Sequence, residues 1–330
     1  MSYFNIIRQR KTRQGFTLVE LLVVIVIIGI LGSLVFVGGQ AAIRAARQGV
    51  IKSEISQVGL ALESYTSKHG EYPPDFSDEA AVLRHVRKRW PSYKFTNFSA
   101  LCADIQAGSL FQDENGKWYA WDFENTDVSH MAALAFWLGG LPEPATGMLG
   151  GFAADVSAPM SVGLPGDGTQ RETPLMELTI GANCKMYQVV NASGNALGTG
   201  TKADPYLVLP AIVARELPFV YFKASAKGDY LQKDSVTDPK HIHFDMCAEL
   251  QEAGCAAPYA KTNAAPDEAV WHNPKGYQLV HPGLDGNFGG GGHPDFRVID
   301  PSKDVRVGCS LADNDNQANF GGTTIEAGGN

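Results

Sequence analysis

An acidic side chain lies at the start of the most apolar part of this sequence, where its negative charge needs a positively charged partner. Glu20 precedes a largely aliphatic run without charges from Leu21 to Ile43. A carboxylate at the edge of a bilayer span is costly to insert unless it is paired. A cut at the Gly15–Phe16 junction would give Phe16 a free ammonium about one helical turn away. In a packed assembly, the amine of one chain can then neutralise Glu20 of its neighbour.

A basic leader precedes this junction. The first fifteen residues carry no acid, and their basic residues are Arg8, Arg10, Lys11 and Arg13. This leader, followed by the stretch GFTLVELLVVI (15–25), strongly resembles the type IV prepilin signature. The resemblance implies that prepilin peptidase removes residues 1–15 by cutting after Gly15, that Phe16 is N-methylated, and that Glu20 serves assembly. Loss of the four basic residues would change the formal net charge from −8 to −12.

A second stretch of sequence resembles one particular group within this family. Residues 60–74, LALESYTSKHGEYPP, are similar to the end of the long helix in type II secretion major pseudopilins (the G-type family), where a Tyr is followed by a Gly and then by Tyr-Pro. The resemblance implies a structural subunit that assembles with other pseudopilins on an inner-membrane platform. The residues between 75 and 275 carry no such resemblance.

The C-terminal region offers candidate metal ligands. Asp285 and Asn287, together with Asp313 and Asp315, supply oxygen ligands on glycine-rich turns, and oxygen is what calcium prefers. Residues 277–289, YQLVHPGLDGNFG, also look like the C-terminal calcium loop of major pseudopilins. The alternative is that these residues only form Asx turns. A zinc set can be assembled from His241, His243, Cys247 and Cys255, but its spacing matches no common zinc pattern.

Five cysteines in an exported chain invite disulfides and leave one over. Cys247 and Cys255 enclose a short loop and are the preferred pair. Cys184 and Cys309 are a second candidate pair, with Cys102 left over. The alternative is that some of these thiols are buried and free.

Other classes of function find little support. The chain has no G-x-S-x-G, H-E-x-x-H or P-loop sequence, so we expect no enzyme. Its 27 basic and 35 acidic residues argue against nucleic acid as a partner, because phosphate binding needs a basic footprint. Apart from the candidate calcium, no cofactor is expected.

The element that positions Phe16 and Glu20 is a predicted transmembrane helix over residues 16–38. A run this long and apolar can cross a hydrocarbon layer of about 30 Å. The basic leader keeps the N-terminus in the cytoplasm by the positive-inside rule, so the remainder is exported. The resemblance to pseudopilins implies a single-pass inner-membrane protein whose exported part lies in the periplasm. A cleaved secretory signal is the alternative, but the apolar run is too long for a usual one.

We expect the helix to continue through residues 39–69 as an amphipathic segment. Ile51, Ile55, Val58, Leu62 and Tyr65 recur at spacings of four and three, which predicts an apolar stripe that packs on a globular domain. A juxtamembrane coiled coil is the alternative. The predicted end is at Gly70, ahead of the prolines at 73 and 74.

The rest, residues 70–330, is predicted to be one α+β domain with a small antiparallel sheet packed on the long helix, as in pilins. Helices are expected over 78–90 and 127–138, and a Gly/Pro-rich insertion over about 139–174. Branched and aromatic residues predict strands at 175–180, 185–190, 206–213, 219–223 and 277–281.

Two functions therefore compete. The first is a pseudopilin, processed by prepilin peptidase and assembled through its N-terminal helix into a type II secretion or type IV pilus-like filament that drives protein export. The second is a membrane-stalked binding module or pilus adhesin.

Overall fold

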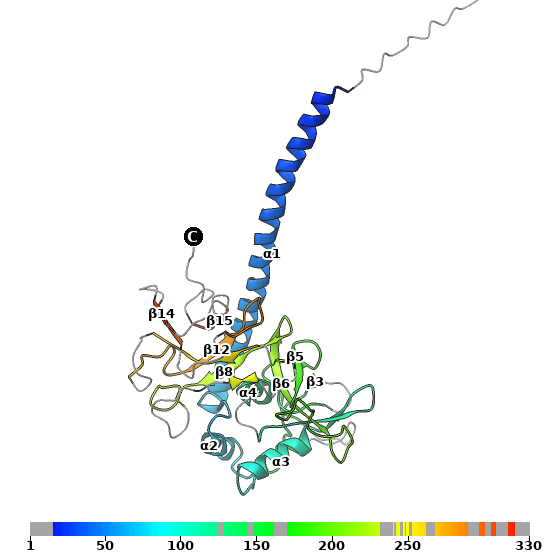
Figure 1. Ribbon diagram of the computed structural model, residues 1–330. Helices are drawn as coiled ribbons and strands as arrows, with labels where there is room; N and C mark the ends of the chain where they lie inside the picture. Colours follow the sequence, from blue (N-terminus) through cyan, green and yellow to red (C-terminus); the bar gives the residue numbers. More distant parts are fainter. Residues whose placement is uncertain are drawn as a thin grey trace, which may run out of the picture. The chain divides into compact units, whose positions relative to one another are not determined.

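The computed structural model describes residues 16–124, 129–143, 148–161, 170–231, 240, 242–244, 247, 249–250, 253–261, 268–289, 297–300, 305–307 and 316–320. The chain divides into two compact units, residues 1–47 and 48–330. Helix α1 (Leu18–His69) supplies its first part to one unit and its second part to the other. Figure 1 gives the order of the elements along the chain.

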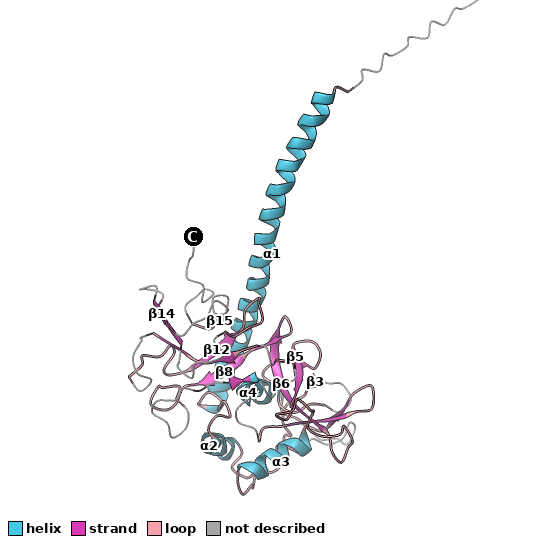
Figure 2. Cartoon of the chain, viewed as in Figure 1, coloured by secondary structure: helices cyan, strands magenta, loops and turns pink. Residues whose placement is uncertain are grey.

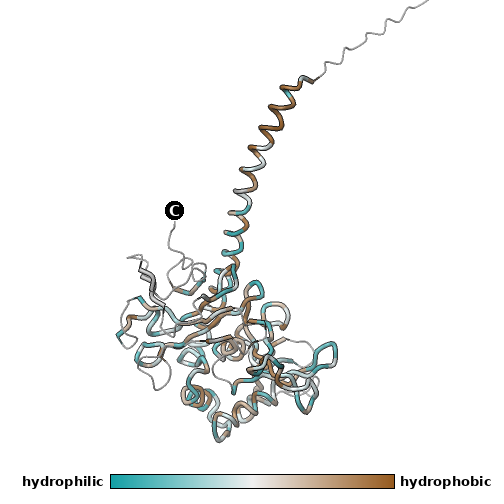
Figure 3. The backbone as a smooth tube through the Cα atoms, in the orientation of Figure 1, coloured by the Kyte–Doolittle hydropathy of each residue, from teal (hydrophilic) through white to brown (hydrophobic). Residues whose placement is uncertain are grey.

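Residues 21–36 of α1 form a largely aliphatic stretch whose large apolar side chains are exposed. Figure 3 shows a continuous hydrophobic stretch there, which gives way to mixed residues further along the helix. Among the described residues, α1 is the helix that is long and apolar enough to cross a membrane. A helix that is apolar all round has no single face to bury in its own chain, so its surroundings must be apolar as well.

The second part of α1 packs on the body of residues 48–330. The five stripe residues Ile51, Ile55, Val58, Leu62 and Tyr65 are all buried, which confirms the predicted stripe. Their neighbours in the core belong to the same chain, so the stripe is not a free coiled-coil seam. The helix ends where predicted: Gly70 has φ +80° and donates its N–H to the Thr66 carbonyl oxygen at 2.7 Å.

Two capped helices follow. Helix α2 (Glu79–Arg89) confirms the helix predicted over 78–90, and the Asp78 side chain caps it by accepting from the Ala80 N–H at 2.9 Å. Helix α3 (Phe98–Gly108) was not predicted. The Asn97 side chain caps it by accepting from the Ala100 N–H at 2.9 Å, and α3 packs against strand β2 (Trp118–Trp121).

The helix predicted over 127–138 is confirmed over its described residues, and its second half is π-helical. Helix α4 (Ser129–Leu134) runs into a π-helical segment, η1 (Ala135–Gly139), which ends at Gly140 with φ +76°. All five residues of η1 are buried. Phe136 and Trp137 both lie in the core.

The larger sheet has five strands in the order β1 (Phe111–Gln112), β2, β6 (Tyr206–Ala214) and β5 (Cys184–Gln188), with β7 (Leu217–Pro218) paired to β6. Strands β5 and β6 pair antiparallel, as expected, with Tyr187 opposite Leu209. Strands β2 and β6 run parallel, so this sheet of the α+β domain is mixed rather than antiparallel throughout. A parallel partner needs a long crossover, and α4, η1 and the insertion supply it.

A second sheet is wholly antiparallel. Strand β12 (Tyr277–His281) lies between β8 (Val220–Lys223) and β15 (Gln317–Ala318), and both β8 and β12 match predicted strands. Helix α4 contacts β6 of the first sheet and β8 of the second, and thus joins them. Figure 2 shows the helices and strands of this body as separate colours.

Shorter pairings complete the described body. Strand β3 (Met148–Leu149) pairs with β4 (Leu178–Thr179), which lies within the strand predicted over 175–180. Strand β9 (Ile242–His243) pairs with β10 (Cys255–Ala256), and β13 (Arg297–Asp300) lies between β11 (Tyr259–Ala260) and β14 (Val305–Val307).

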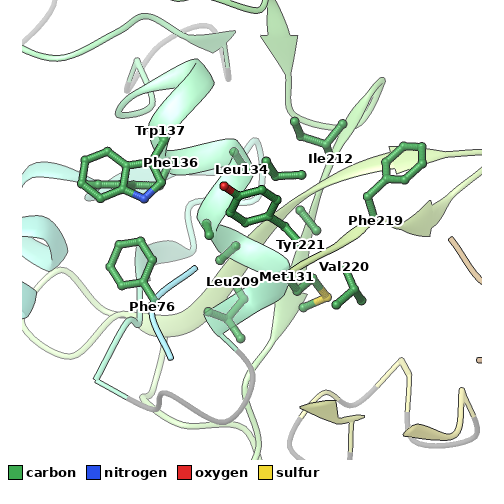
Figure 4. Close-up of a cluster of buried hydrophobic side chains, with 14 of the residues drawn as sticks. Phe76, Met131, Leu134, Phe136, Trp137, Leu209, Ile212, Phe219, Val220 and Tyr221 are labelled. Carbon is green, nitrogen blue, oxygen red and sulfur yellow. The ribbon is translucent and has the colours of Figure 1, made fainter. Parts of the chain in front are cut away.

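The core is aromatic around the segment that follows α1. Phe76 lies 5.7 Å from the Trp137 ring and 5.6 Å from the Phe136 ring, measured between centroids. Figure 4 shows these rings together, with Met131 and Leu134 of α4 beside Tyr221 of β8. Phe76 has φ +63°, a left-handed conformation that costs a bulky residue energy, so packing around it has to hold it there.

Candidate functional site

The N-terminus of α1 holds the carboxylate that the sequence singles out. Glu20 Oε2 accepts a hydrogen bond from the Thr17 N–H at 2.9 Å and one from the Thr17 hydroxyl at 2.8 Å. In return, the Glu20 N–H donates to Thr17 Oγ1 at 3.2 Å. This reciprocal pattern is a capping box, with Thr17 at the N-cap and Glu20 at the third helical position.

Local capping gives Glu20 a partner that the sequence reasoning missed. The signal was readable, because Thr17-Leu18-Val19-Glu20 has the T-x-x-E spacing of a capping box. The capping box holds the carboxylate at the start of the helix, four residues from Phe16. Gly15 and the rest of the leader lie outside the described residues, so cleavage there stays a prediction.

Comparison with known protein families matches this same segment. Residues 10–36 match the prokaryotic N-terminal methylation motif. The N-terminus thus carries a prepilin-like motif. The methylation motif includes both the Gly15–Phe16 junction and Glu20, so the residues selected by their chemistry are those that the motif contains.

A curated relative extends the likeness beyond the methylation motif. The chain is 38% identical over 65 residues to the type II secretion system core protein G of Pseudomonas aeruginosa (strain PAO1). The match covers 20% of this chain and 46% of the relative, so it spans less than half of the relative's length. No solved structure matches the chain.

A polar network lies at the other end of α1, where it meets α2. The Tyr65 hydroxyl is 2.6 Å from His85 Nε2, and His85 Nδ1 is 2.8 Å from Glu71 Oε1. Burial lowers the pKa of His85 to about 4, so the ring is neutral at ordinary pH. Because the Glu71 carboxylate only accepts, the proton belongs on Nδ1, and Nε2 accepts from the Tyr65 O–H.

Arg89 connects this network to the insertion. Its Nη1 donates to Tyr65 Oη at 3.2 Å, and its Nη2 donates to Glu172 Oε2 at 3.2 Å. The Arg89 side chain is 6% exposed, and its guanidinium lies over the Trp90 ring at 4.3 Å. Lys68 of α1 reaches the same oxygen of Glu172 at 3.4 Å.

A buried ion pair fixes the segment that follows α1. Lys240 Nζ lies 2.6 Å from Asp75 Oδ2, and both side chains are less than a tenth exposed. The Lys223 N–H donates to the same oxygen at 2.7 Å, and the Ser77 hydroxyl donates to Asp75 Oδ1 at 2.6 Å. Burial by itself would raise the pKa of Asp75, but the Lys240 ammonium and these donors hold it well below its usual range.

The structure describes only part of the candidate calcium site. Asp285 Oδ1 accepts from the Asn287 N–H at 2.9 Å, and Asn287 Oδ1 accepts from the Gly289 N–H at 2.6 Å. These are two consecutive Asx turns, which place two oxygen-bearing side chains close together. Asp313 and Asp315 lie outside the described residues. No group of three His, Cys, Asp or Glu residues suited to a metal occurs within the described part of the chain.

The preferred disulfide is wrong. Cys247 is a buried free thiol, so the predicted bond between Cys247 and Cys255 does not form. The backbone around Cys247 forms tight turns: the Cys247 N–H donates to the Phe244 carbonyl oxygen, and the Leu250 N–H donates to that of Cys247. Cys184 is likewise buried and free, which excludes its pairing with Cys309. Cys102, the residue left over in the predicted pairing, is a buried free thiol as well. His241 of the zinc alternative lies outside the described residues.

Proposed function

We propose that this chain is a pseudopilin, a structural and non-enzymatic subunit of a type II secretion or type IV pilus-like filament. The observation that carries the proposal is the capping box between Thr17 and Glu20, directly after the Gly15–Phe16 junction, at the start of an apolar helix. The methylation motif over residues 10–36 and the likeness to core protein G support it.

Processing and topology follow from this proposal. The leader, residues 1–15, stays in the cytoplasm, α1 crosses the inner membrane once, and the body lies in the periplasm. Prepilin peptidase cuts after Gly15 and the new N-terminus at Phe16 is methylated. A glycine at the cut site suits a peptidase because it has no side chain to block approach to the backbone.

Assembly uses the apolar part of α1. Its exposed aliphatic side chains pack against the same helix of other pseudopilins, on an inner-membrane assembly platform, and the filament drives protein export. The Phe16 amine of one chain neutralises Glu20 of its neighbour, which removes the cost of a bare carboxylate at the edge of an apolar bundle.

The body is proposed to bind calcium. Two of the four oxygen ligands, Asp285 and Asn287, lie on one pair of Asx turns, and their donor chemistry suits calcium. Asp313 and Asp315 complete the proposed set.

Replacing Glu20 tests the assembly step. Glutamine can still accept from the Thr17 N–H, so Glu20→Gln keeps the capping box and removes only the charge. Both Glu20→Gln and Glu20→Ala should be inserted and processed but should not appear in filaments sheared from cells. Glu54→Ala, an acid further along α1, is the matched control and should assemble. Filaments from Glu20→Gln at the normal level would overturn the pairing with a neighbour's amine.

A further inference from the structure

The insertion between η1 and β4 brings a carboxylate to a buried arginine. Glu172 Oε2 accepts from Arg89 Nη2 at 3.2 Å, and the Glu172 side chain is 26% exposed, against 6% for Arg89. The Arg89 guanidinium also lies over the Phe152 ring at 4.7 Å, so the insertion contributes both a charge and an aromatic face to it. A buried guanidinium needs a counter-ion, and in the described part of the chain Glu172 is the acid that forms an ion pair with it.

The same arginine holds the last turns of α1. Arg89 Nη1 donates to the hydroxyl of Tyr65, which is fully buried and continues the chain of hydrogen bonds to His85. Lys68, one turn further along α1, pairs with the oxygen of Glu172 that Arg89 contacts. One carboxylate from the insertion therefore connects the end of α1 with the end of α2.

Backbone contacts fix the position of Glu172. Its N–H donates to the Phe152 carbonyl oxygen at 2.8 Å, and a Cβ placed on Gly151, where φ is +85°, would lie 1.8 Å from the Glu172 carbonyl oxygen. On the other side, the Leu175 N–H donates to the Leu138 carbonyl oxygen at 2.8 Å, which ties the insertion back to η1. The carboxylate is thus presented by a segment that is anchored before and after it.

We infer that the insertion is a strap that holds the end of α1 to the body, with the Glu172–Arg89 ion pair as its fastening. When this ion pair is lost, Arg89 is left buried without a counter-ion. The last turns of α1 and α2 then open locally while the two sheets stay folded. The role of the strap rests on the proposed function: in a filament subunit, the joint between helix and body has to transmit force.

Amide hydrogen exchange on the full chain in detergent micelles tests the strap. Glu172→Gln should speed exchange at residues 62–70 by about tenfold, because Arg89 is left buried without a counter-ion, and should leave exchange in β8 and β12 unchanged. Glu177→Gln, an exposed acid in the same part of the chain, is the matched control and should behave like the unchanged protein. Exchange at residues 62–70 that stays slow in Glu172→Gln, or that rises equally in β12, would overturn the inference.

A double variant distinguishes the loss of the Glu172–Arg89 ion pair from a general loss of stability. In Arg89→Met/Glu172→Gln both charges are gone and the apolar stem remains over the rings, so residues 62–70 should exchange more slowly than in Glu172→Gln alone. Faster exchange in the double variant would count against an unpaired charge as the cause. The measurement does not depend on filaments, so the strap and the proposed function fail separately.

Discussion

Glu20 binds Thr17 in the isolated chain and, in the proposed assembly, also the Phe16 amine of a neighbouring chain. The Thr17 backbone and hydroxyl already hold its carboxylate at the start of α1. A neighbour's amine therefore meets an acceptor that is already oriented, and less conformational entropy is lost on pairing. The cap and the ion pair are thus compatible uses of one side chain.

The Gly15–Phe16 junction gives a prediction about processing. The full chain, produced with a prepilin peptidase, should yield a membrane form that starts at Phe16 and carries an N-terminal methyl group, as read by mass spectrometry. Gly15→Val adds a branched side chain at the cut and should leave the leader attached. A Gly15→Val chain that is cut at the normal rate would contradict this account, whereas Gln14→Ala should be processed normally.

Asp75 gives a prediction about acid stability. Its folded pKa lies below its usual 3.8, so the stabilisation from its ionised form is fully present above about pH 4 and is lost as the pH falls below that value. Asp75→Asn should lower the free energy of unfolding at pH 7 by about 3–5 kcal/mol, because Lys240 is left buried without its counter-ion. The measurement is denaturant unfolding of the full chain in micelles at several pH values.

The control for Asp75 has the same local geometry at the surface. Asp155 Oδ1 accepts from the N–H and the hydroxyl of Ser157, as Asp75 Oδ1 does from Ser77, but Asp155 is exposed. Asp155→Asn should change stability little, and Asp75→Asn/Lys240→Met should recover part of the loss. Equal losses from Asp75→Asn and Asp155→Asn would assign the effect to the turn rather than to the buried pair.

At the scale of elements, sequence patterns predicted the features that depend on residues close together in the chain. The apolar stripe of α1 and its end at Gly70 follow from spacing and from glycine, and β12 has the predicted bounds of 277–281. Helix α3 has a readable cap at Asn97 and was missed. The parallel pairing of β2 with β6 joins Tyr119 to Tyr206, and no local pattern encodes a partner that far away.

Two glycines with similar backbone conformations give a prediction about the strap. Gly151 and Gly181 have φ +85° and +86°, but only at Gly151 would a Cβ meet other atoms, with the Glu172 carbonyl oxygen at 1.8 Å. Gly181→Ala should cost about 1–2 kcal/mol of stability from the left-handed conformation alone. Gly151→Ala should cost clearly more, measured by denaturant unfolding, and should also speed exchange at residues 62–70. Equal losses in the two variants would show that the close approach to Glu172 relaxes without consequence.

At the scale of the whole molecule, the N-terminal candidate residues could be predicted and the body's polar sites could not. Phe16 and Glu20 lie within a few residues of each other, so sequence spacing alone relates them. Arg89 and Glu172 are 83 residues apart, and Asp75 and Lys240 are 165 apart. Such pairs become visible only when the fold brings them together. The preferred disulfide failed for the same reason, since nearness in sequence does not set the geometry that a disulfide needs.

The calcium proposal predicts a change in melting temperature. An ion that binds only the folded chain stabilises it by about 2.7 kcal/mol at a hundredfold excess over Kd. The full chain in micelles, shown to be metal-free at the outset, should melt at a higher temperature in calcium than in chelator. Asp313→Ala should shrink that difference, while Asp113→Ala, an acid in a turn elsewhere, should not. Identical melting curves with and without calcium would leave Asp285 and Asn287 as turn formers only.

The contacts around Asp75 also constrain the order in which parts of the body can fold. The Pro73 carbonyl oxygen accepts from the Tyr221 hydroxyl, which lies 148 residues later in the chain. Asp75 pairs with Lys240, which lies 165 residues later. A chain emerges N-terminus first, and closing such long loops is slow. The segment beside α1 is therefore among the first of the body to be synthesised and among the last to be completed. In the proposed topology, export of this body would begin with an open chain, and its fold would close only after most of its length had crossed.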